Sequence, residues 1–284
     1  MLGTGAYAAA NAGALKSLRA RGIEPYAVCG MHMGAWIAGL HLCGYDESEM
    51  EAAISFAAGK GRRLIAVRRS GDSSLIGRER WSCSSMLISR MIHAQLGERL
   101  LGLCDRRGVF LCRSAANGRR VVFSTRPYAQ GTDVSLMMQA SVAFAARAAM
   151  AQPPFISSMT WLGSPLIPEE NPAYAVGQLL RMGADGVLVV EPRASASHEP
   201  DALELCPASR RWALEENLPE RTGILRIMMP ADTGALSFKQ MPRIAEAAFA
   251  ASQTQLDGVL SGMGMAACRV LPFRTRAEQI SRRC

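Results

Sequence analysis

The chain has 284 residues, is 49% hydrophobic and carries a formal net charge of +8. This length and apolar content suffice for a large core, and no linker-like change of composition divides the chain. We therefore expect residues 1–284 to form a single domain. No apolar run reaches the ~18 residues that a membrane-spanning helix needs, and no basic segment followed by an apolar one marks a signal peptide at the start.

The cysteines argue against metal and disulfide frameworks. Eight are present, at positions 29, 43, 83, 104, 112, 206, 268 and 284, without a Cys-x-x-Cys pair or a regular spacing. Reduced thiols in a cytosol fit this pattern best. We expect a cytoplasmic protein with no metal and no cofactor.

The positive charge is concentrated in the less regular stretch 60–126. Fifteen Lys and Arg residues stand there against four acids. Such a stretch is either a solvated face or a surface for anionic partners. An anionic membrane surface at the inner face, contacted through Arg62, Arg63, Arg68 and Arg69, is the partner that we consider. No nucleic-acid-binding motif accompanies the charge, so we do not expect nucleic acid as a partner.

The first elements are a glycine-rich loop and a helix, Ala8–Arg21, which Gly22 ends as a C-cap. A short strand at 26–29 leads into the sequence Gly-Met-His-Met-Gly, and a helix at 35–43 follows. Asp46 should cap the next helix, Glu47–Ala58. Residues 82–101 have apolar side chains at close to helical spacing.

The second half alternates between strands and helices. Strands are expected at Val109–Cys112 and Arg120–Ser124, joined by the turn Asn117-Gly118. Further on we expect an Ala/Met-rich helix at Asp133–Met150 and two apolar strands at Gly186–Glu191 and Ile224–Met229. A last helix is expected at Pro242–Ser252. This alternation predicts an α/β fold with a central, mostly parallel sheet and helices on both faces.

The sequence Gly30-Met31-His32-Met33-Gly34 has the form of a nucleophile elbow, Gly-x-Ser-x-Gly, with His32 at the centre. In such a turn the central residue has positive φ, and the flanking glycines let strand and helix approach closely. The dipole of the following helix favours negative charge at the site.

A second glycine-rich segment, Gly3-Thr4-Gly5-Ala6, precedes the first helix. A loop of this type at a helix N-terminus can present backbone N–H groups to an anion. On its own the segment is a weak signal, since it is also compatible with a simple turn. Its value lies in the order loop, helix, strand, elbow and helix within 45 residues.

This order resembles the opening of the patatin-like phospholipases. Gly13-Ala14-Leu15-Lys16-Ser17-Leu18 and Gly44-Tyr45-Asp46 resemble the flanks of that family's elbow, and softer matches extend over nearly the whole chain, at 139–143, 182–190 and 230–238. The resemblance implies a three-layer α/β sandwich, an oxyanion loop at Gly3–Ala6, and hydrolysis of lipid esters by a Ser–Asp dyad.

The residues that would form the dyad are missing. His32 stands at the Ser position, and no Asp lies between Asp133 and Asp185, where the catalytic Asp would be expected. Glu169 and Glu170 are the nearest acids, and we expect both to be solvated. In the loop, Tyr7 replaces the family's Arg and Ala8 a Gly. Only Met1 and Leu2 remain of the first strand, so either the start codon lies upstream or the fold tolerates a stub.

These departures favour a patatin-like protein without phospholipase activity that binds lipid, an acyl chain or a protein partner. The alternatives are an active lipid acyl hydrolase with unorthodox residues and a protein of anionic membrane surfaces. His32 itself either fills the turn, or attacks esters as a neutral imidazole, or binds metal with Cys29, His41 and Cys43. His93 is expected at or near the surface, and the sixteen Met residues are expected in the core.

Overall fold

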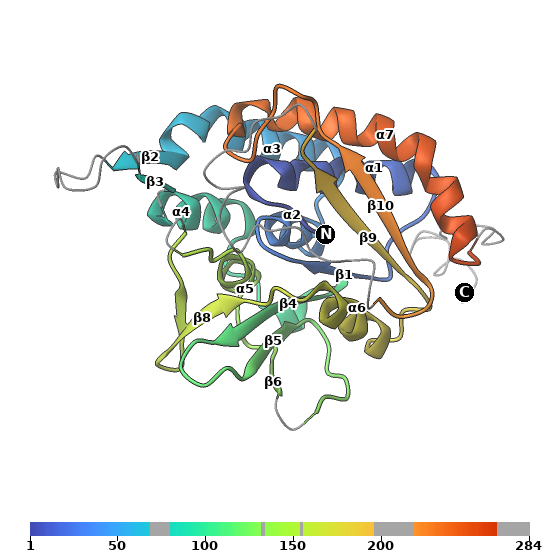
Figure 1. Cartoon of the computed structure of the whole chain (residues 1–284). Coiled ribbons are helices and arrows are strands. Elements are labelled where there is room, and N and C mark those ends of the chain that lie inside the picture. Colours follow the sequence, from blue (N-terminus) through green and yellow to red (C-terminus); the bar gives the residue numbers. More distant parts are fainter. Residues whose placement is uncertain (69–79, 84, 132–133, 154–155, 196–217, 266–284) are drawn as a thin grey trace, which may run out of the picture.

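The computed structural model describes residues 1–68, 80–83, 85–131, 134–153, 156–195 and 218–265, with only the backbone described over 62–68 and 80–83. It is an α/β fold whose described strands form one six-stranded sheet and two two-stranded sheets (Figure 1). Among the described residues, no helix is both long enough and apolar enough to cross a membrane.

The N-terminal elements follow the prediction closely. A 3-10 helix at Gly5–Ala9 leads into α1 at Ala10–Ala20. The next elements are β1 at Ala27–Gly30, α2 at Gly34–Leu42 and α3 at Glu47–Leu64. Gly22 ends α1 with a φ of +70°, and its N–H donates to the carbonyl of Arg19. Asp46 caps α3 by accepting from the N–H of Glu49, whose carboxylate accepts from the N–H of Asp46. This reciprocal pair is a capping box. α3 is longer than expected, since it continues beyond Ala58.

A six-stranded sheet forms the lower part of the molecule in Figure 1. Its order is β6-β5-β4-β8-β7, and β1 pairs with the first half of β4. The bounds are Arg107–Ser114 for β4, Arg120–Ser124 for β5, Val134–Met137 for β6, Met159–Trp161 for β7 and Ser164–Pro168 for β8. β1–β4 and β5–β6 are parallel, while β4–β5, β4–β8 and β7–β8 are antiparallel.

The prediction of a mostly parallel sheet is therefore wrong. The predicted turn at Asn117-Gly118 is present, with Gly118 at a φ of +71°. A short turn can only join neighbouring strands as an antiparallel hairpin, because a parallel pair needs a long crossover. The connection between β7 and β8 is also short, so these two strands are antiparallel as well.

The single helix expected over Asp133–Met150 is also wrong in its first part. Val134–Met137 forms β6, parallel to β5, and α5 begins only at Val142 and ends at Ala149. Ser141 starts α5, because its hydroxyl accepts from the N–H of Phe144. The side-chain cap sets this boundary, and an Ala/Met-rich composition does not reveal it.

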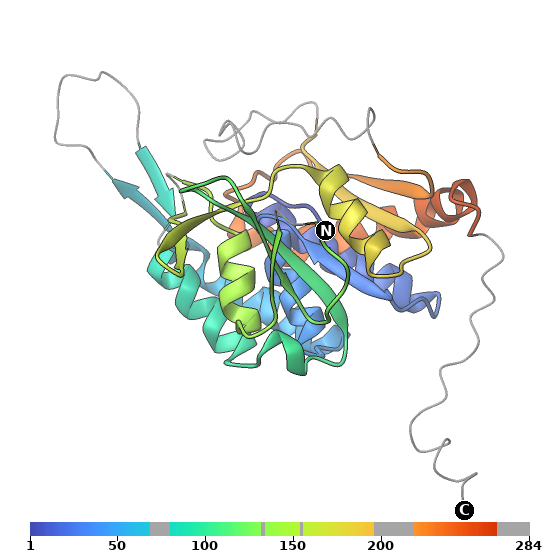
Figure 2. The ribbon, with the colours of Figure 1, turned by 90° about the horizontal axis from the view of Figure 1, so that it is seen from below.

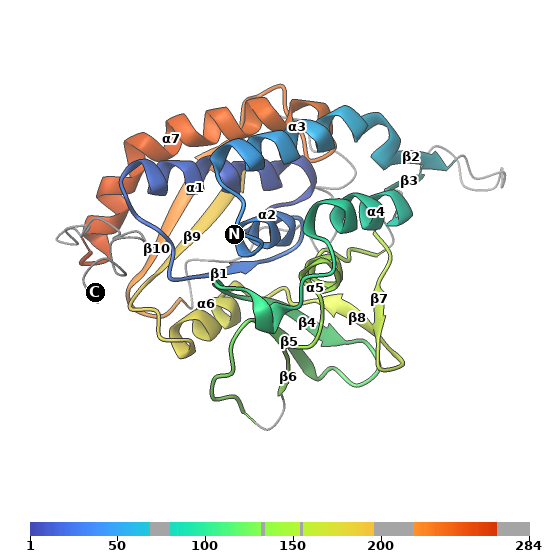
Figure 3. The same cartoon turned by 180° about the vertical axis from the view of Figure 1, so that it is seen from behind.

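The remaining elements include a second, two-stranded parallel sheet of β9 and β10. β9 is Val187–Arg193 and β10 is Thr222–Met228, as the two apolar runs predicted. The long C-terminal helix α7, Met241–Gly262, packs along α1, and both lie close to α3 (Figure 3). The other helices are α4 at Ser85–Leu96 and α6 at Pro172–Arg181. A hairpin is formed by β2 at Ile65–Arg68 and β3 at Arg80–Cys83. Two short 3-10 helices lie at Leu101–Leu103 and Phe238–Gln240.

Side chains of β4 show that both faces of the six-stranded sheet are covered. Phe110 and Cys112 face one core with α2 and α5, whereas Val109 and Leu111 face a second core with Val176 of α6. Figure 2 shows α5 and α6 beside different parts of the strands. The expectation of helices on both faces is thus met.

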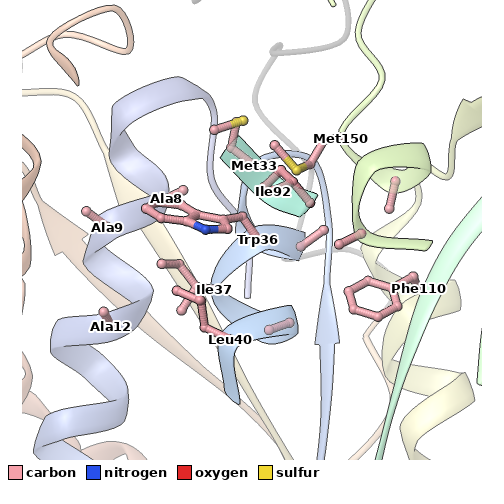
Figure 4. Packing of buried hydrophobic residues seen from close by; sticks show 14 of the residues in the cluster. Ala8, Ala9, Ala12, Met33, Trp36, Ile37, Leu40, Ile92, Phe110 and Met150 are labelled. Atoms are coloured by element: carbon pink, nitrogen blue, oxygen red, sulfur yellow. The ribbon is translucent and has the colours of Figure 1, made fainter. Parts of the chain in front are cut away.

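The first core centres on α2. Trp36, Ile37 and Leu40 are fully buried and lie beside the alanines of the first helical segment, Ala8, Ala9 and Ala12 (Figure 4). Small residues on that segment allow α2 to approach it closely. The packing therefore fixes α2, and with it the turn that precedes it.

Candidate functional site

The elbow is formed as the sequence predicts. β1 ends at Gly30 and α2 begins at Gly34, and His32 between them has a φ of +49°. The N–H of Gly34 donates to the carbonyl of Met31, and the N–H of Ala35 donates to that of His32, both at 3.0 Å. These bonds close the first helical turn directly on the elbow.

The two glycines of the elbow are required by close backbone approaches. A Cβ on Gly30 would lie 2.3 Å from the Cα of Ala35, and one on Gly34 would lie 2.5 Å from the carbonyl oxygen of Met1. Both distances are far below ordinary contact, so neither position accommodates a larger residue without backbone movement. Met31 and Met33 flank His32 and are buried.

His32 is enclosed by the protein. Its side chain is 1% exposed, and burial lowers its pKa to about 4. A desolvated imidazole disfavours its charged form, so the ring is neutral at pH 7. The elbow therefore presents neither an open nucleophile nor a cation.

The glycine-rich loop lies beside the elbow, but some of its donors are already used. The N–H of Ala6 donates to the carbonyl of Ala235 at 2.7 Å, and the N–H of Tyr7 to that of Thr4 at 3.1 Å. Gly5 has a φ of +53°, and a Cβ on Gly3 would lie 2.7 Å from the Cα of Ala8. Thr4 is the N-cap of the 3-10 helix and makes no side-chain cap bond.

Tyr7 occupies the place where the resemblance implies an arginine. It is buried, and its hydroxyl donates to the carbonyl of Thr233 at 2.9 Å. The loop is thus tied through Tyr7 and Ala6 to the segment that precedes α7. Its polar groups serve the packing of the chain on itself.

Glu169 corrects the expectation of a solvated carboxylate. It is 3% exposed and lies 3.3 Å from the Nε of Arg120 and 3.8 Å from that of Arg113. Its carboxylate also accepts from the N–H groups of Glu170 and Asn171, just before α6. Glu170 is exposed, as expected. Glu169 therefore joins the β4–β5 hairpin to the start of α6.

The histidines and cysteines considered for metal binding are not brought together. His41 lies 3.1 Å from the guanidinium of Arg19, and the thiol of Cys43 donates to the carbonyl of Leu96. Within the described part of the chain no group of three or more His, Cys, Asp or Glu residues is arranged to hold a metal. His93 is exposed, 3.6 Å from Glu98. His198 falls outside the described residues.

Arg147 is a buried cation that the sequence analysis missed. It is 2% exposed on α5 and donates to the hydroxyl of Ser89 and to the carbonyl of Ser157. Burial lowers its pKa to about 10. The sequence signal for this buried cation is that Arg147 is the single charged residue in the Ala-rich run Val142–Ala149.

The arginines proposed for a membrane surface cannot be placed in the same detail. Arg69 lies outside the described residues, and at Arg62, Arg63 and Arg68 only the backbone is described. Elsewhere in 60–126, Arg90, Arg99 and Arg119 are exposed. Arg90 lies on α4, Arg99 follows α4, and Arg119 lies at the tip of the β4–β5 hairpin.

Comparisons with known proteins give a limited result. No family model matches the sequence, and no curated protein gives a significant match. A solved structure, VipD from Legionella pneumophila, is similar with a TM-score of 0.46 and 12% identity. The match covers 91% of this chain and 66% of the VipD chain.

Proposed function

We propose that this chain is a patatin-like protein that lacks phospholipase activity and acts by binding a lipid, an acyl chain or a protein partner. The observation that carries the proposal is the burial of His32, 1% exposed at the centre of the elbow. A nucleophile must come within about 3–3.5 Å of the carbon that it attacks. A side chain without exposed surface does not reach an ester that arrives from solvent.

The state of the loop supports the same proposal. Hydrolysis of an ester needs N–H donors that are aimed at the developing oxyanion. In this chain the N–H groups of Ala6 and Tyr7 donate to carbonyl groups of the protein. A loop held in this way has two fewer N–H donors to offer to an oxyanion.

The acids give a third line of support. Without a general base, a nucleophile loses several orders of magnitude in rate. No Asp lies between Asp133 and Asp185. Glu169, the first acid in this interval, is engaged by Arg113 and Arg120. A carboxylate with these partners serves to hold two strands to α6.

A second candidate is an acyl hydrolase that uses His32 itself. It is favoured by one observation, that burial lowers the pKa of His32 to about 4, so the ring is in its nucleophilic form at pH 7. Attack by a ring nitrogen on an activated ester would give an acyl-imidazole and release the alcohol. Water would then hydrolyse the acyl-imidazole, which releases the carboxylic acid and restores the neutral ring.

Hydrolysis of p-nitrophenyl butyrate by the natural protein, His32→Ala and His32→Ser separates the two candidates. His93→Ala serves as the control, because His93 is an exposed histidine far from the elbow in sequence. We expect all four proteins to hydrolyse the ester at the same background rate. Turnover by the natural protein and His93→Ala that His32→Ala abolishes would establish the hydrolase instead.

A third candidate is a protein of anionic membrane surfaces. It is favoured by the charge of the stretch 60–126, with fifteen Lys and Arg residues against four acids. The attraction between such a stretch and anionic headgroups acts over about one Debye length, so salt weakens it. Salt dependence of binding is therefore the property that distinguishes this candidate.

A further inference from the structure

The helices α1, α3 and α7 meet on the upper side of the molecule in Figure 3, and a groove of about 440 Å³ lies where they meet. Its apolar lining comes from all three helices, with Ala12 and Leu15 of α1, Met50 and Ile54 of α3, and Ala245 and Phe249 of α7. The residues of α1 and α3 among these are buried, so the groove reaches down to the first core. We call this cavity the helix groove.

The charged side chains of the helix groove are mostly acidic. Glu47 and Glu51 of α3 and Glu246 of α7 line it, against Lys16 of α1. The chain as a whole has a net charge of +8, so the sign of the charge is reversed at this place. Lys16 pairs with Glu51, whereas no ion pair between described residues includes Glu47 or Glu246. The helix groove therefore holds two carboxylates, one on α3 and one on α7, that no cation of the described chain neutralises.

Lys16 shows how the helix groove holds a cation. Its ammonium donates to Oε1 of Glu51 at 2.6 Å and lies 5.3 Å from the ring centroid of Phe249. Lys16 thus reaches from α1 to a carboxylate of α3 and to an aromatic ring of α7. The hydrogen bond to Glu51 raises the pKa of Lys16, and the charges of Glu47 and Glu246 act in the same direction. The three carboxylates therefore act on one place, where a further cation would gain from the two that are unpaired.

Contacts between the three helices fix the shape of the helix groove. A Cβ on Gly13 would lie 2.1 Å from the carbonyl oxygen of Ala245, so α1 and α7 are in backbone contact beside the groove. The pair of Lys16 and Glu51 joins α1 to α3. A groove that is held in place before binding spares an occupant the cost of ordering it.

We propose that the helix groove binds an amphipathic helix of a partner protein, with apolar side chains on one face and Lys or Arg on both flanks of that face. The walls of the groove are helices, which bond their own backbone groups internally except at their ends. The groove therefore offers side-chain contacts, and an occupant needs a backbone that is satisfied by itself, as a helix has. His32 does not line the groove, so the proposal goes beyond the elbow and does not rest on whether the elbow is catalytic.

The charge of the helix groove separates a basic helix from other occupants. An acyl chain would match the apolar lining, but it would cover Glu47 and Glu246 without giving them cations, which costs free energy. An anionic membrane surface would bring like charges together. A second copy of the chain, bound groove to groove, would do the same, because an isologous contact places the same patch on both sides. A helix with basic flanks fills the apolar part and neutralises both carboxylates.

The test measures binding of a synthetic peptide, acetyl-Ala-Lys-Leu-Lys-Ala-Leu-Leu-Ala-Lys-Leu-Lys-Ala-amide, to the full chain by calorimetry. In a helix its Leu residues lie on one face, at i, i+3, i+4 and i+7, and its Lys residues lie on both flanks of that face. One altered peptide has Glu in place of every Lys, and another has Pro in place of the central Ala, which breaks the helix. We expect 1:1 binding of the first peptide, weakened by salt, and no binding of the other two.

Two pairs of acids test the part played by charge. The variant with Glu47→Gln and Glu246→Gln removes the unpaired carboxylates of the helix groove, and binding should become roughly fivefold weaker, as the loss of two exposed ion pairs predicts. The matched control, Glu170→Gln with Glu220→Gln, changes the net charge equally at exposed acids that do not line the groove. Binding to the control should equal that to the natural protein.

Two variants of α3 locate the site. Ser55 and Ala52 are both exposed on this helix, but Ser55 lines the helix groove and Ala52 does not. Ser55→Trp places a large ring in the groove and should weaken binding by at least about tenfold, because the apolar face of the peptide then has no place. Ala52→Trp should bind as the natural protein does. Both positions are exposed, so both variants should fold, and circular dichroism checks this.

Several results would overturn the proposal. Equal binding of the Pro peptide would exclude a helix as the occupant, and no binding at about 1 mM of the first peptide would exclude this surface. Full competition by spermine at the affinity of the peptide would make the helix groove a site for small cations. Peptide binding only after removal of the Arg-rich segment 266–284 would make that segment of the chain the occupant. Self-association of the natural protein that Ser55→Trp abolishes would make it a second copy.

Discussion

A Cβ on Gly30 would lie 2.3 Å from the Cα of Ala35, across the turn that carries His32. The last residue of β1 and the second residue of α2 are therefore in direct backbone contact. This contact fixes the angle between strand and helix and holds His32 at positive φ. The elbow is thus a constraint of packing, and it persists whatever side chain stands at its centre.

The first prediction tests this contact. Gly30→Ala should destabilise the protein by roughly 1–3 kcal/mol, as forced overpacking does. The control is Gly59→Ala on α3, where no atom outside the neighbouring helix backbone lies within 4 Å of the added Cβ. This change should stabilise the protein by about 1 kcal/mol through helix propensity. Urea unfolding of the two variants measures both. Equal stability of Gly30→Ala and the natural protein would show that the strand and helix are not held at this distance.

The second prediction concerns acid stability. Burial lowers the pKa of His32 to about 4 and of His41 to about 3, against about 6.5 in the unfolded chain. The unfolded state then binds more protons than the folded state below pH 6.5, so stability falls as the pH falls. Each histidine contributes roughly 1.4 kcal/mol per pH unit in this window, down to its folded pKa.

His32→Asn isolates one of these contributions. Asn tolerates positive φ and does not titrate. Between pH 6.5 and pH 4 the stability of this variant should fall less steeply than that of the natural protein, whatever its stability at pH 7. Parallel stability curves in this range would mean that His32 titrates normally in the folded state.

The third prediction compares two neighbouring acids. Glu169→Ala should destabilise by roughly 1–3 kcal/mol, because the N–H groups of Glu170 and Asn171 lose their acceptor and two arginines lose their partner. Glu170→Ala removes an exposed side chain and should change stability by less than about 0.5 kcal/mol. Thermal unfolding measures the difference. If both variants behave alike, the buried ion pair does not hold α6 to the hairpin.

The fourth prediction concerns membrane binding. The variant with Gln at Arg62, Arg63, Arg68 and Arg69 should leave any binding to uncharged phosphatidylcholine vesicles unchanged. If the stretch 60–126 binds anionic headgroups, sedimentation with phosphatidylserine vesicles should fall in this variant. For the natural protein it should fall between 50 and 500 mM salt, a range over which the Debye length shortens about threefold. Salt-independent sedimentation would exclude this surface.

Local signals in the sequence accounted for much of the fold. Gly22 and Asp46 marked helix ends because their effects depend on neighbouring residues only, and the elbow was recognisable from its glycines. The sheet was predicted less well. Pairing of β4 with both β1 and β8 depends on contacts between distant segments, and the Asn117-Gly118 turn fixes the relative direction of β4 and β5 only.

The candidate site shows the same division. The positive φ of His32 follows from the spacing of Gly30 and Gly34, so it could be predicted. The burial of Glu169 could not, because Arg113 and Arg120 reach it from another part of the chain.

The central claim, that His32 is enclosed at the elbow, is tested most directly by its reaction with diethylpyrocarbonate at pH 7, followed by mass spectrometry. This reagent modifies neutral imidazoles that it can reach. His93 is exposed, whereas His32 and His41 are buried. We predict rapid modification of His93 while His32 and His41 stay unmodified in the folded protein and react in urea. Modification of His32 at the rate of His93 would show that the elbow is open, and would contradict the account.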